Sequence, residues 1–584
     1  MFNFLKANKI ILSIISFLII GLGIYANSFQ NEFIWDDDDS IVNNAYIQDF
    51  RHFPKYFSEN LIAGSGQTTN YWRPVLLISF ALDYKIFNLN PLGYHLTNTL
   101  LHILVAILGF FLIYTLSQKK FLLSYLPALL FLVHPLQTEA ITYIAGRADP
   151  LSSVFALLTL IFYVNFRNKN NKKYLFFSVG TFLLALLTKE QSILLPALVL
   201  LVEVCFFSNK DNWRQNIKIP LYLFGISVLY FLSRITFLNF NDILGGANNV
   251  AGYNASLFNR LLTFTWVIIK YLALLFVPKN LHMAYEIEPI TSILSPSVFL
   301  FIAVFALVIF IIYKTWRENK LISFGYLWFI IILLPRTNII SINRPLYEHW
   351  LYLPMLGFWL GTLTLIIYLF KKFQTLKWQK ISLNLLIIVV IIFATFLSYL
   401  TILRNKDWRN PITFYEKNLK YTPNSYIQKN NLGMNYARVD RHQEAIRQYQ
   451  ESLEILDVYP QVHSNLANSL LAIGELEEAE KECQKALEID DSFILPYQTL
   501  INIYLTQRDA AKLNLLLTQL ETKTNPETFF NLAVSTLLSL QDYEGAINLT
   551  QRMLEKYPNN VELNNVLLNL KIKQLNNSTQ YNNQ

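Results

Sequence analysis

Long apolar segments recur through the first two thirds of the chain, and each has the length of a membrane-spanning helix or nearly so. We expect spans near residues 10–26, 95–116, 121–137, 150–167, 173–188, 191–207, 218–238, 297–313, 322–340, 349–370 and 381–402. The apolar segment 260–278 differs because it also carries Arg260, Thr263, Thr265 and Lys270. We predict that it forms an interfacial or re-entrant helix.

Basic residues between the apolar segments support this count. They cluster in alternate loops, and basic loops are retained on the cytoplasmic side. All clusters fall on one side with Lys6 and Lys9 only if 260–278 does not cross: Lys119–Lys120, Arg167–Lys173, Lys210–Lys218, Lys314–Lys320 and Lys371–Lys380. The pattern predicts about 11 spans, a cytoplasmic N-terminus and an extracytoplasmic C-terminus.

The pattern changes after residue 403, where the chain becomes polar and helical with a 34-residue period. Asn431-Leu432 recurs as Asn465-Leu466, and Glu444-Ala445 recurs as Glu478-Ala479. Small residues at fixed positions let paired helices approach, which is typical of tetratricopeptide repeats. Two units are clear and two are degenerate. We expect 404–424 to cap the array.

These elements predict an all-α protein with a polytopic membrane bundle followed by an α-solenoid. The expected divisions are a membrane domain over 1–403, an extracytoplasmic repeat domain over 404–573 and a disordered Asn/Gln-rich tail over 574–584.

Composition agrees with a membrane protein, since 53% of the 584 residues are hydrophobic. The net charge of +8 belongs to loops between apolar segments, so we expect the lipid bilayer, and no nucleic acid, as a partner. Cys205 and Cys483 lie in different domains, and no disulfide is expected.

Four consecutive carboxylates, Asp36 to Asp39, follow Phe33 and Trp35 in the first outside loop. The aromatic residues suit a membrane interface, which would hold the carboxylates at headgroup level. One carboxylate there could accept a proton from a hydroxyl nucleophile. A neighbour could hold a divalent cation that offsets charge on a phosphate. The plainer interpretation is a solvated acidic loop.

A second polar group joins two apolar segments. It comprises His134, Glu139, Arg147 and Asp149. Ionisable groups at membrane depth are costly, which favours a functional role. The alternative is an Arg147–Asp149 or Glu139–Arg147 pair that only shapes the hairpin.

Two further groups lie in short outside loops. Lys189 could meet a phosphate as a point charge, although a local pair with Glu190 is equally consistent with the sequence. Arg336, Arg344, Glu348 and His349 precede Tyr352-Leu353-Pro354, and arginine suits bidentate phosphate recognition. His95 and His102 share one apolar helix, where we expect them to pack rather than bind a ligand.

The order of these motifs resembles one family, the transmembrane and tetratricopeptide-repeat-containing proteins and their bacterial relatives. The shared order is Trp35-Asp36-Asp37, His134-Pro135 with Glu139, Gly146 to Asp149, Lys189-Glu190, Glu348 with Tyr352-Leu353-Pro354, Trp408-Arg409 and the repeats. One departure is His349, which stands where an arginine is expected, with Arg344 five residues earlier.

The resemblance implies a fold C glycosyltransferase similar to protein O-mannosyltransferases. It implies a polyprenyl- or dolichyl-phosphate sugar donor, a Ser or Thr acceptor on an exported protein, and Asp36 and Asp37 as the catalytic acidic pair. We predict that Arg147, Lys189, Arg344 and His349 bind the donor phosphate. The residues expected to support them are His134, Glu139, Asp149, Glu190, Glu348 and Tyr352. Asp38 and Asp39 would bind Mg²⁺ or Mn²⁺, if any cation is needed.

Two other interpretations remain. The chain could be a membrane-anchored scaffold whose repeats bind envelope proteins, or a lipid-linked polysaccharide transferase with a different acceptor. A scaffold does not need acidic and basic groups at the outer ends of separate helices. The richness in Ile, Asn and Lys favours a bacterial plasma membrane over the endoplasmic reticulum.

Overall fold

The computed structural model describes residues 2–208, 213–236, 255–283, 285–339, 344–373, 376–558 and 560–581. Within these residues the chain is helical and has no strand. It divides into two compact units, Met1–Thr422 and Pro423–Gln584. The predicted all-α architecture, with a membrane bundle and a repeat domain, is confirmed.

Long helices make up most of the first unit. They are α1 (Phe2–Tyr25), α5 (Pro91–Leu116), α6 (Phe121–Val133), α8 (Ala148–Lys169), α9 (Lys172–Thr188), α10 (Leu195–Val202), α12 (Lys218–Thr236), α13 (Leu257–Phe276), α14 (Pro296–Thr315), α15 (Lys320–Leu333), α16 (Tyr352–Phe373) and α17 (Leu376–Asn405). A π-helical turn, η8 (Glu203–Phe207), extends α10.

Short elements connect these helices. Between α1 and α5 lie η1 (Ala26–Ser28), η2 (Asp38–Val42), α2 (Ala45–Gln48), η3 (Phe50–His52), α3 (Lys55–Ser58), η4 (Ala63–Ser65) and α4 (Pro74–Phe87). The others are η5 (Pro135–Gln137), α7 (Thr138–Ile141), η6 (Ile144–Arg147), η7 (Glu190–Leu194), α11 (Trp213–Asn216), η9 (Leu334–Thr337), η10 (Glu348–Leu351), η11 (Lys406–Trp408) and α18 (Pro411–Leu419).

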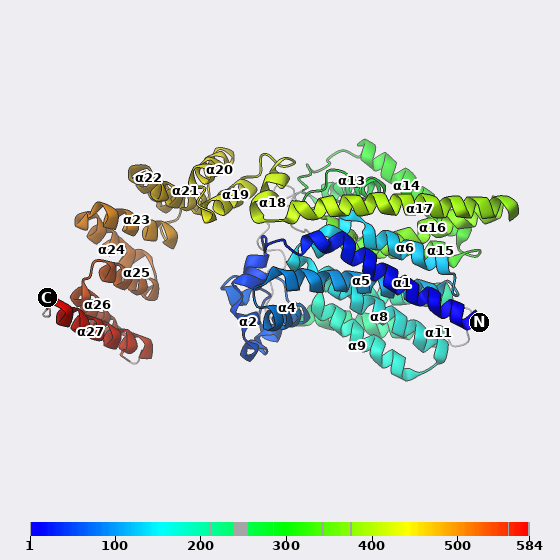
Figure 1. Cartoon of the computed structure of the whole chain (residues 1–584), viewed down its shortest axis with the longest axis horizontal. Helices are drawn as coiled ribbons and strands as arrows, with labels where there is room; N and C mark the ends of the chain where they lie inside the picture. Colours follow the sequence, from blue (N-terminus) through cyan, green and yellow to red (C-terminus); the bar gives the residue numbers. More distant parts are fainter. Residues whose placement is uncertain are drawn as a thin grey trace. The chain divides into compact units, whose positions relative to one another are not determined.

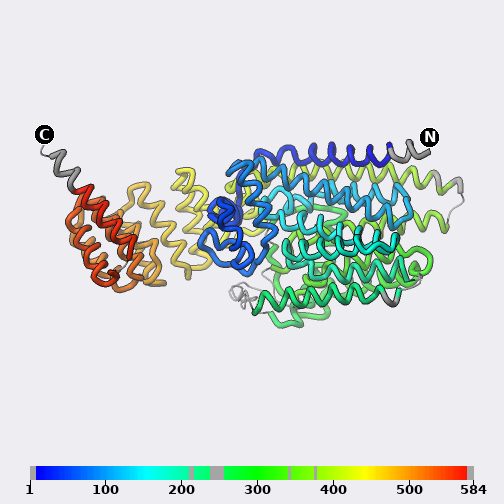
Figure 2. Tube along the Cα trace, turned by 90° about the horizontal axis from the view of Figure 1, so that it is seen from below, coloured from blue at the N-terminus to red at the C-terminus, as the bar shows by residue number. Residues whose placement is uncertain are grey.

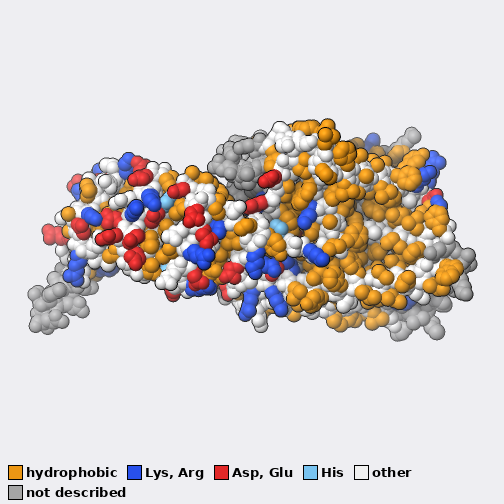
Figure 3. Space-filling view, turned by 90° about the horizontal axis from the view of Figure 1, so that it is seen from above, with side chains coloured by type: hydrophobic (Ala, Val, Ile, Leu, Met, Phe, Trp, Pro, Cys, Tyr) orange, Lys and Arg blue, Asp and Glu red, His pale blue; other side chains and the backbone are white. Residues whose placement is uncertain are grey.

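The first unit has the surface of a membrane protein. Ten helices of the described residues, and one bent pair over Phe121–Ile141, are long and apolar enough to cross a membrane. Figure 3 shows hydrophobic side chains over the sides of this unit, with charged side chains toward its ends. In Figures 1 and 2 the N-terminus of α1 and the short elements after it lie at opposite ends of the bundle. We call the end with the acidic run the acidic end.

Helix α13 meets the length and composition of a span, but its contacts favour the predicted interfacial course. Arg260 donates to the carbonyl of Ile339, and Tyr271 donates to that of Tyr347. The carbonyl of Leu275 is 3.1 Å from Nε2 of His134. These partners, spread along α13, belong to segments at the acidic end. Helix α9 is shorter, with 17 residues, and packs along α8.

Small residues allow a close contact between α15 and α16 in the bundle interior. A Cβ on Gly325 of α15 would lie 2.5 Å from the backbone nitrogen of Gly361 on α16. Gly357 and Gly361 are four residues apart, and they face α15 as small residues do in packed membrane helices.

The second unit consists of antiparallel helix pairs, as the 34-residue period predicts. They are α19 (Tyr426–Arg438) with α20 (His442–Ile455), α21 (Pro460–Ala472) with α22 (Leu476–Ile489), α23 (Ile494–Gln507) with α24 (Ala510–Lys523), and α25 (Pro526–Ser539) with α26 (Tyr543–Lys556), followed by α27 (Val561–Tyr581). Gly433 lies against the ring of Tyr449, so the small position permits the helix pairing.

Two boundary predictions need correction. Segment 404–424 was expected to cap the repeats, but 404–422 packs with the first unit, where Asn418 accepts a hydrogen bond from the Met283 backbone. The tail predicted to be disordered is helical over 574–581 as part of α27, and 582–584 lie outside the described residues.

Candidate functional site at the acidic end

The acidic run begins in an unusual backbone conformation. Trp35 has a φ of 59°, which is uncommon for a residue with a side chain. Its ring stacks on Tyr143 at 5.5 Å between ring centroids, and Tyr143 stacks on Trp408 at 5.6 Å. This aromatic column joins the first loop, the α7–η6 connection and η11.

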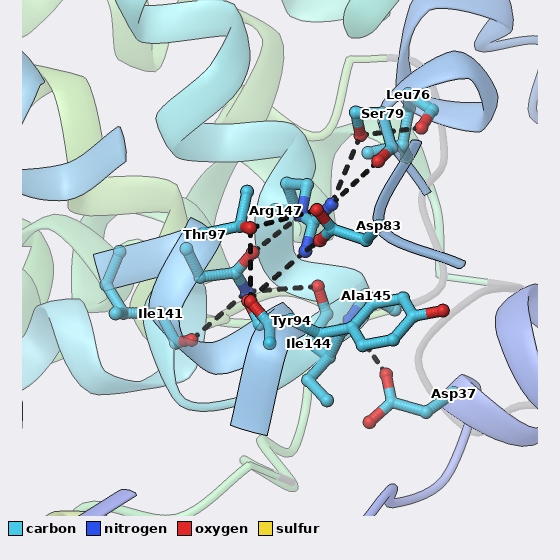
Figure 4. A network of polar contacts seen from close by, with 12 residues as sticks. Asp37, Leu76, Ser79, Asp83, Tyr94, Thr97, Ile141, Ile144, Ala145 and Arg147 are labelled. Carbon is cyan, nitrogen blue, oxygen red and sulfur yellow. Dashed lines mark hydrogen bonds and ion pairs between the residues drawn. The ribbon is translucent and has the colours of Figure 1, made fainter. Parts of the chain in front are cut away.

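Asp37 is buried and bound by the backbone. Its carboxylate accepts hydrogen bonds from the Ile34 N–H at 2.9 Å and the Ala145 N–H at 2.7 Å (Figure 4). Burial raises the pKa of Asp37 to about 8 against the effect of these donors. Asp37 therefore ties the first loop to η6, and it has little access to a substrate.

Asp36 is different because its side chain is exposed. Removal from bulk water raises its pKa to about 6, opposed by a hydrogen bond from Tyr143 and reinforced by the charge of Asp39. A carboxylate with solvent access and a pKa near 6 is ionised at neutral pH, and it remains basic enough to take a proton.

Arg147 holds η6 in place from inside the protein. Its guanidinium pairs with Asp83 at 2.5 Å and donates to Asn98, Ser79 and Tyr94 (Figure 4). Its side chain is fully buried. This geometry does not fit the prediction that Arg147 binds the donor phosphate, because these protein acceptors already engage its guanidinium. Neither of the two pairs considered from sequence is the one formed by Arg147 here.

Gly146 permits this arrangement through a close approach. A Cβ at this position would lie 2.7 Å from the carbonyl oxygen of Glu139 and 3.1 Å from the backbone of Ala140. The turn thus packs directly on α7, which positions the Ala145 N–H for Asp37.

A basic cluster lies at the same acidic end as Asp36, and we define it as Arg73, Lys189 and Arg336. Arg73 forms a bidentate pair with Glu190, at 2.6 and 3.1 Å. Lys189 pairs with Asp149 at 2.6 Å, and Arg336 lies over the ring of Trp350. Burial lowers the pKa of Lys189, and the positive charges of Arg73 and Arg336 add to this effect.

Tyr71 connects Asp36 with the basic cluster. The Arg73 guanidinium lies 4.2 Å from the centroid of its ring. Burial raises the pKa of the Tyr71 hydroxyl; Glu190 and Asp36 raise it further, whereas Arg73 and Arg336 lower it. The candidate base and the basic cluster therefore act on the same side chain.

The remaining predicted residues fall into two groups. Glu139 accepts from His349 through both the ring Nδ1, at 2.9 Å, and the backbone N–H. His349 lies within electrostatic range of the basic cluster. Glu348 binds Tyr285 at 3.0 Å and pairs with Arg404 at 3.3 Å. These contacts hold the η10 turn beside the site.

Other predicted residues have packing roles. His134 bonds to the Leu275 carbonyl and the Leu136 N–H, and Tyr352 bonds to His102 at 2.7 Å. His95 bonds to the Asn31 carbonyl, so both histidines of α5 pack against neighbours as expected. The structure places Arg344 near Tyr347 and His282, rather than in the basic cluster as defined.

Asp38 and Asp39 lie on the π-helical turn η2 and are partly exposed. Among the described residues, no group of three or more His, Cys, Asp or Glu side chains is arranged to hold a metal ion. A divalent cation takes about six oxygen ligands, so water and substrate oxygens would have to supply most of them. The divalent cation stays a prediction.

The sequence did not single out Arg73 or Tyr143. Arg73 had one usable signal, because a basic residue in an outside loop is not explained by retention on the cytoplasmic side. Tyr143 had no such sequence signal, because Trp35 and Trp408, which stack on it in the structure, are distant from it along the chain.

Comparisons with known proteins agree with the family resemblance. A model of the tetratricopeptide repeat family matches residues 426–490. Protein O-mannosyl-transferase F38B6.6 of Caenorhabditis elegans is 27% identical over 465 residues, which are 76% of this chain and 63% of the relative.

Two human proteins are also similar. Protein O-mannosyl-transferase TMTC2 is 30% identical over 299 residues, 46% of this chain and 35% of the relative. Protein O-mannosyl-transferase TMTC3 is 24% identical over 513 residues, 80% of this chain and 54% of the relative. The chain spans about one third to two thirds of the length of these relatives. By these matches and by its repeat domain, the chain is similar to protein O-mannosyl-transferases and carries tetratricopeptide repeats.

Proposed function

We propose that this protein is a membrane glycosyltransferase. It transfers mannose or another hexose from a polyprenyl- or dolichyl-phosphate donor to a hydroxyl acceptor. The acceptor is a Ser or Thr of an exported polypeptide bound by the repeats. The observation that carries the proposal is that the exposed Asp36 carboxylate, with its pKa near 6, and the basic cluster act on the same side chain, Tyr71, at the acidic end.

The reaction assigns each group a task. Asp36 takes the proton from the acceptor hydroxyl as that oxygen bonds to the anomeric carbon. The bond between that carbon and the phosphate oxygen breaks, and the lipid phosphate leaves with the electron pair. Attack opposite the leaving group inverts the anomeric centre.

The basic cluster would stabilise the negative charge on the departing phosphate. Arg73 and Arg336 can each present two parallel N–H groups, and Lys189 adds a point charge. Glu190 and Asp149 hold two of these side chains in position. His349 lies within electrostatic range of this set, whereas Arg344 lies near Tyr347 and His282. Both stay predicted phosphate ligands. A divalent cation at Asp38 and Asp39 would further offset phosphate charge.

The proposed orientation of the protein in the membrane follows from the positions of the basic loops. The acidic end and the repeats are extracytoplasmic, and the N-terminus is cytoplasmic. The membrane is proposed to be a bacterial plasma membrane; the named relatives are animal proteins.

Purified protein in detergent, supplied with labelled polyprenyl-phosphate hexoses and Ser/Thr peptides, tests the proposal. We expect one donor to be consumed and its sugar to appear on the peptide, and Asp36→Asn to abolish this transfer. Asp49→Asn is the matched control, because Asp49 is an acidic residue of the same loop paired with Arg51. If the label passed to an added lipid-linked polysaccharide and not to the peptide, the acceptor would be that polysaccharide and not a polypeptide. Full activity in Asp36→Asn, or no donor consumption, would overturn the proposal in favour of a scaffold.

A further inference from the structure

Tyr71 lies in a segment of the first outside loop whose backbone is held by hydrogen bonds from other parts of the chain. Arg234 of α12 donates to the carbonyl oxygen of Asn70. The N–H of Leu61 donates to the carbonyl oxygen of Tyr71 at 2.8 Å. The backbone that carries the Tyr71 ring is therefore tied both to a membrane helix and to an earlier turn of the loop.

The two side chains that follow Tyr71 anchor the same segment. The buried Trp72 ring stacks on Tyr230, with 5.7 Å between the ring centroids. The Arg73 guanidinium is held by both carboxylate oxygens of Glu190. A movement of the segment would break these contacts, so the position of the Tyr71 ring is set before any ligand binds. Such preorganisation reduces the entropy lost on binding.

The Tyr71 side chain itself is 43% exposed, unlike its anchored neighbours. The Arg73 guanidinium lies over one face of the ring, 4.2 Å from the centroid. The exposed area of the ring therefore lies on its other face and at its edge. Pockets for small ligands commonly present such an aromatic surface beside a few fixed polar groups.

The proposed reaction determines what must lie beside this ring. In an inverting displacement, the base and the leaving group stand on opposite sides of the anomeric carbon. Asp36 and the basic cluster both act electrostatically on Tyr71. A hexose that spans the base and the phosphate site therefore passes beside the exposed part of the Tyr71 ring.

We propose that the Tyr71 ring is the surface on which the hexose of the donor packs, an inference that rests on the proposed function. The C–H bonds on one face of a hexose are apolar and slightly positive, whereas the face of an aromatic ring is negative. The Tyr71 hydroxyl can also donate to, or accept from, a sugar hydroxyl. Tyr71 thus recognises the sugar, and the basic cluster recognises the phosphate.

Binding to the full chain in detergent, without any acceptor, separates these two kinds of recognition. The ligands are polyprenyl-phosphate mannose, polyprenyl-phosphate glucose and polyprenyl methyl phosphate, compared by isothermal titration calorimetry. In the last ligand a methyl group replaces the sugar, so the charge of the phosphodiester is kept. We expect at least one hexose lipid to bind more tightly than the methyl analogue.

Substitution of the ring should remove this preference. We expect Tyr71→Leu to weaken binding of the preferred hexose lipid about tenfold, the upper range for an aromatic contact. Binding of the methyl analogue should not change, which also shows that the variant is folded. Tyr71→Phe keeps the ring and should keep most of the preference for the hexose.

The matched control is Phe53→Leu. Phe53 belongs to the same loop and is also 43% exposed, but its ring packs on Tyr56 and Phe57. This variant should bind all three ligands like the parent protein. An equal loss of hexose binding in Phe53→Leu would overturn the inference, because the effect would then not be specific to Tyr71.

Three other results would also overturn the inference. They are equal affinity of the parent for the hexose lipids and the methyl analogue, an equal loss of both kinds of ligand in Tyr71→Leu, and the same loss of hexose binding in Tyr71→Phe. Hexose-dependent binding at Tyr71 without transfer of the sugar to a peptide would refute the proposed function alone. Transfer whose KM for the donor is unchanged in Tyr71→Leu would refute the inference alone.

Discussion

At the residue scale, the Asp36 carboxyl combines solvent access with a pKa near 6. A base with this pKa is protonated in acid, so we expect the transfer rate to fall about tenfold per pH unit below about 6 and to level off above it. Because the surrounding protein removes part of the hydration of Asp36 and so raises its pKa, the loss of activity occurs at higher pH than for an ordinary aspartate. A pH–rate profile of kcat/KM checks this.

Substitutions at Asp36 and at its neighbour Asp37 distinguish the role of a base from the role of a side chain that holds the backbone. Asp36→Asn should lower kcat by about 10²- to 10⁴-fold, the usual contribution of a general base. Asp37→Asn keeps one acceptor oxygen for the Ile34 and Ala145 N–H groups, so the loss should be smaller. The two kcat values are compared on the plateau of the pH–rate profile, well above pH about 6. Equal losses of kcat in the two variants would contradict the prediction, because they would mean that both carboxylates touch the substrate.

Arg147 supports the fold by satisfying a buried charge. Arg147→Met leaves Asp83 buried without its partner, which should cost about 3–5 kcal/mol of stability. The double variant Arg147→Met with Asp83→Leu removes both charges and should recover much of that loss. The stability of both variants is measured by thermal unfolding in detergent, with size-exclusion chromatography used to monitor the folded fraction. A stable Arg147→Met protein with weakened donor binding would instead restore the phosphate role.

At the element scale, the η6 turn transmits packing to the site. Gly146→Ala would push the turn away from Glu139 and Ala140, since its Cβ would lie 2.7 Å from a carbonyl oxygen. The Ala145 N–H would then lose its place against Asp37. We expect at least about a tenfold loss of kcat, because displacements of about 1 Å are costly in an active site. Peptide binding by the repeats, measured in parallel, should not change.

His463 offers a pH-dependent contact between α21 and its neighbours. Its two ring nitrogens lie 2.6 Å from Glu482 and 2.6 Å from Asp457, and Lys485 pairs with Glu482. Burial lowers the pKa of His463, but the two carboxylates outweigh this and raise it above its ordinary value.

A raised folded-state pKa means that the stabilisation is complete below the unfolded value of about 6.5 and is lost as pH rises through the folded value. Amide hydrogen exchange in α21 and α22, corrected for intrinsic rates, should therefore be slower at pH 6 than at about pH 9. His463→Gln should remove this difference. A difference that survives the substitution would place the titrating group elsewhere.

At the scale of the whole molecule, the side of the membrane that each segment faces can be tested directly. We expect an impermeant maleimide to label cysteines at Ser58 and Glu475 on intact cells, and to label Lys120→Cys only after lysis. All three positions are exposed, and the native Cys205 and Cys483 are buried. Labelling of Lys120→Cys together with Ser58→Cys in intact cells would contradict the proposed orientation.

Much of the architecture could be predicted because it depends on local patterns. Apolar length predicts the spans, and the 34-residue period predicts the repeats. The interfacial character of 260–278 was visible in its polar residues, and the contacts of α13 support it. The cap over 404–424 was wrong because the packing partner of α18 is set by distant residues such as Met283.

The candidate site was only partly predictable. Motifs near helix ends identified the acidic run, Lys189, Glu190 and His349, since charged groups in short outside loops are conspicuous. Sequence could not rank Asp36 above Asp37, which differ only through their exposure and backbone contacts. It also assigned Arg147 to the phosphate, because its partner Asp83 lies on a different helix.

The sequence by itself therefore determined the class of protein, the number of apolar segments and the repeat, because hydrophobic burial and helix periodicity act over neighbouring residues. The tertiary structure decided which charges pair with each other and which remain accessible. Those outcomes depend on desolvation and distance between segments far apart in the chain. Asp83, Arg73 and Tyr143 acquire their roles only when α4, η7 and η11 meet at the acidic end.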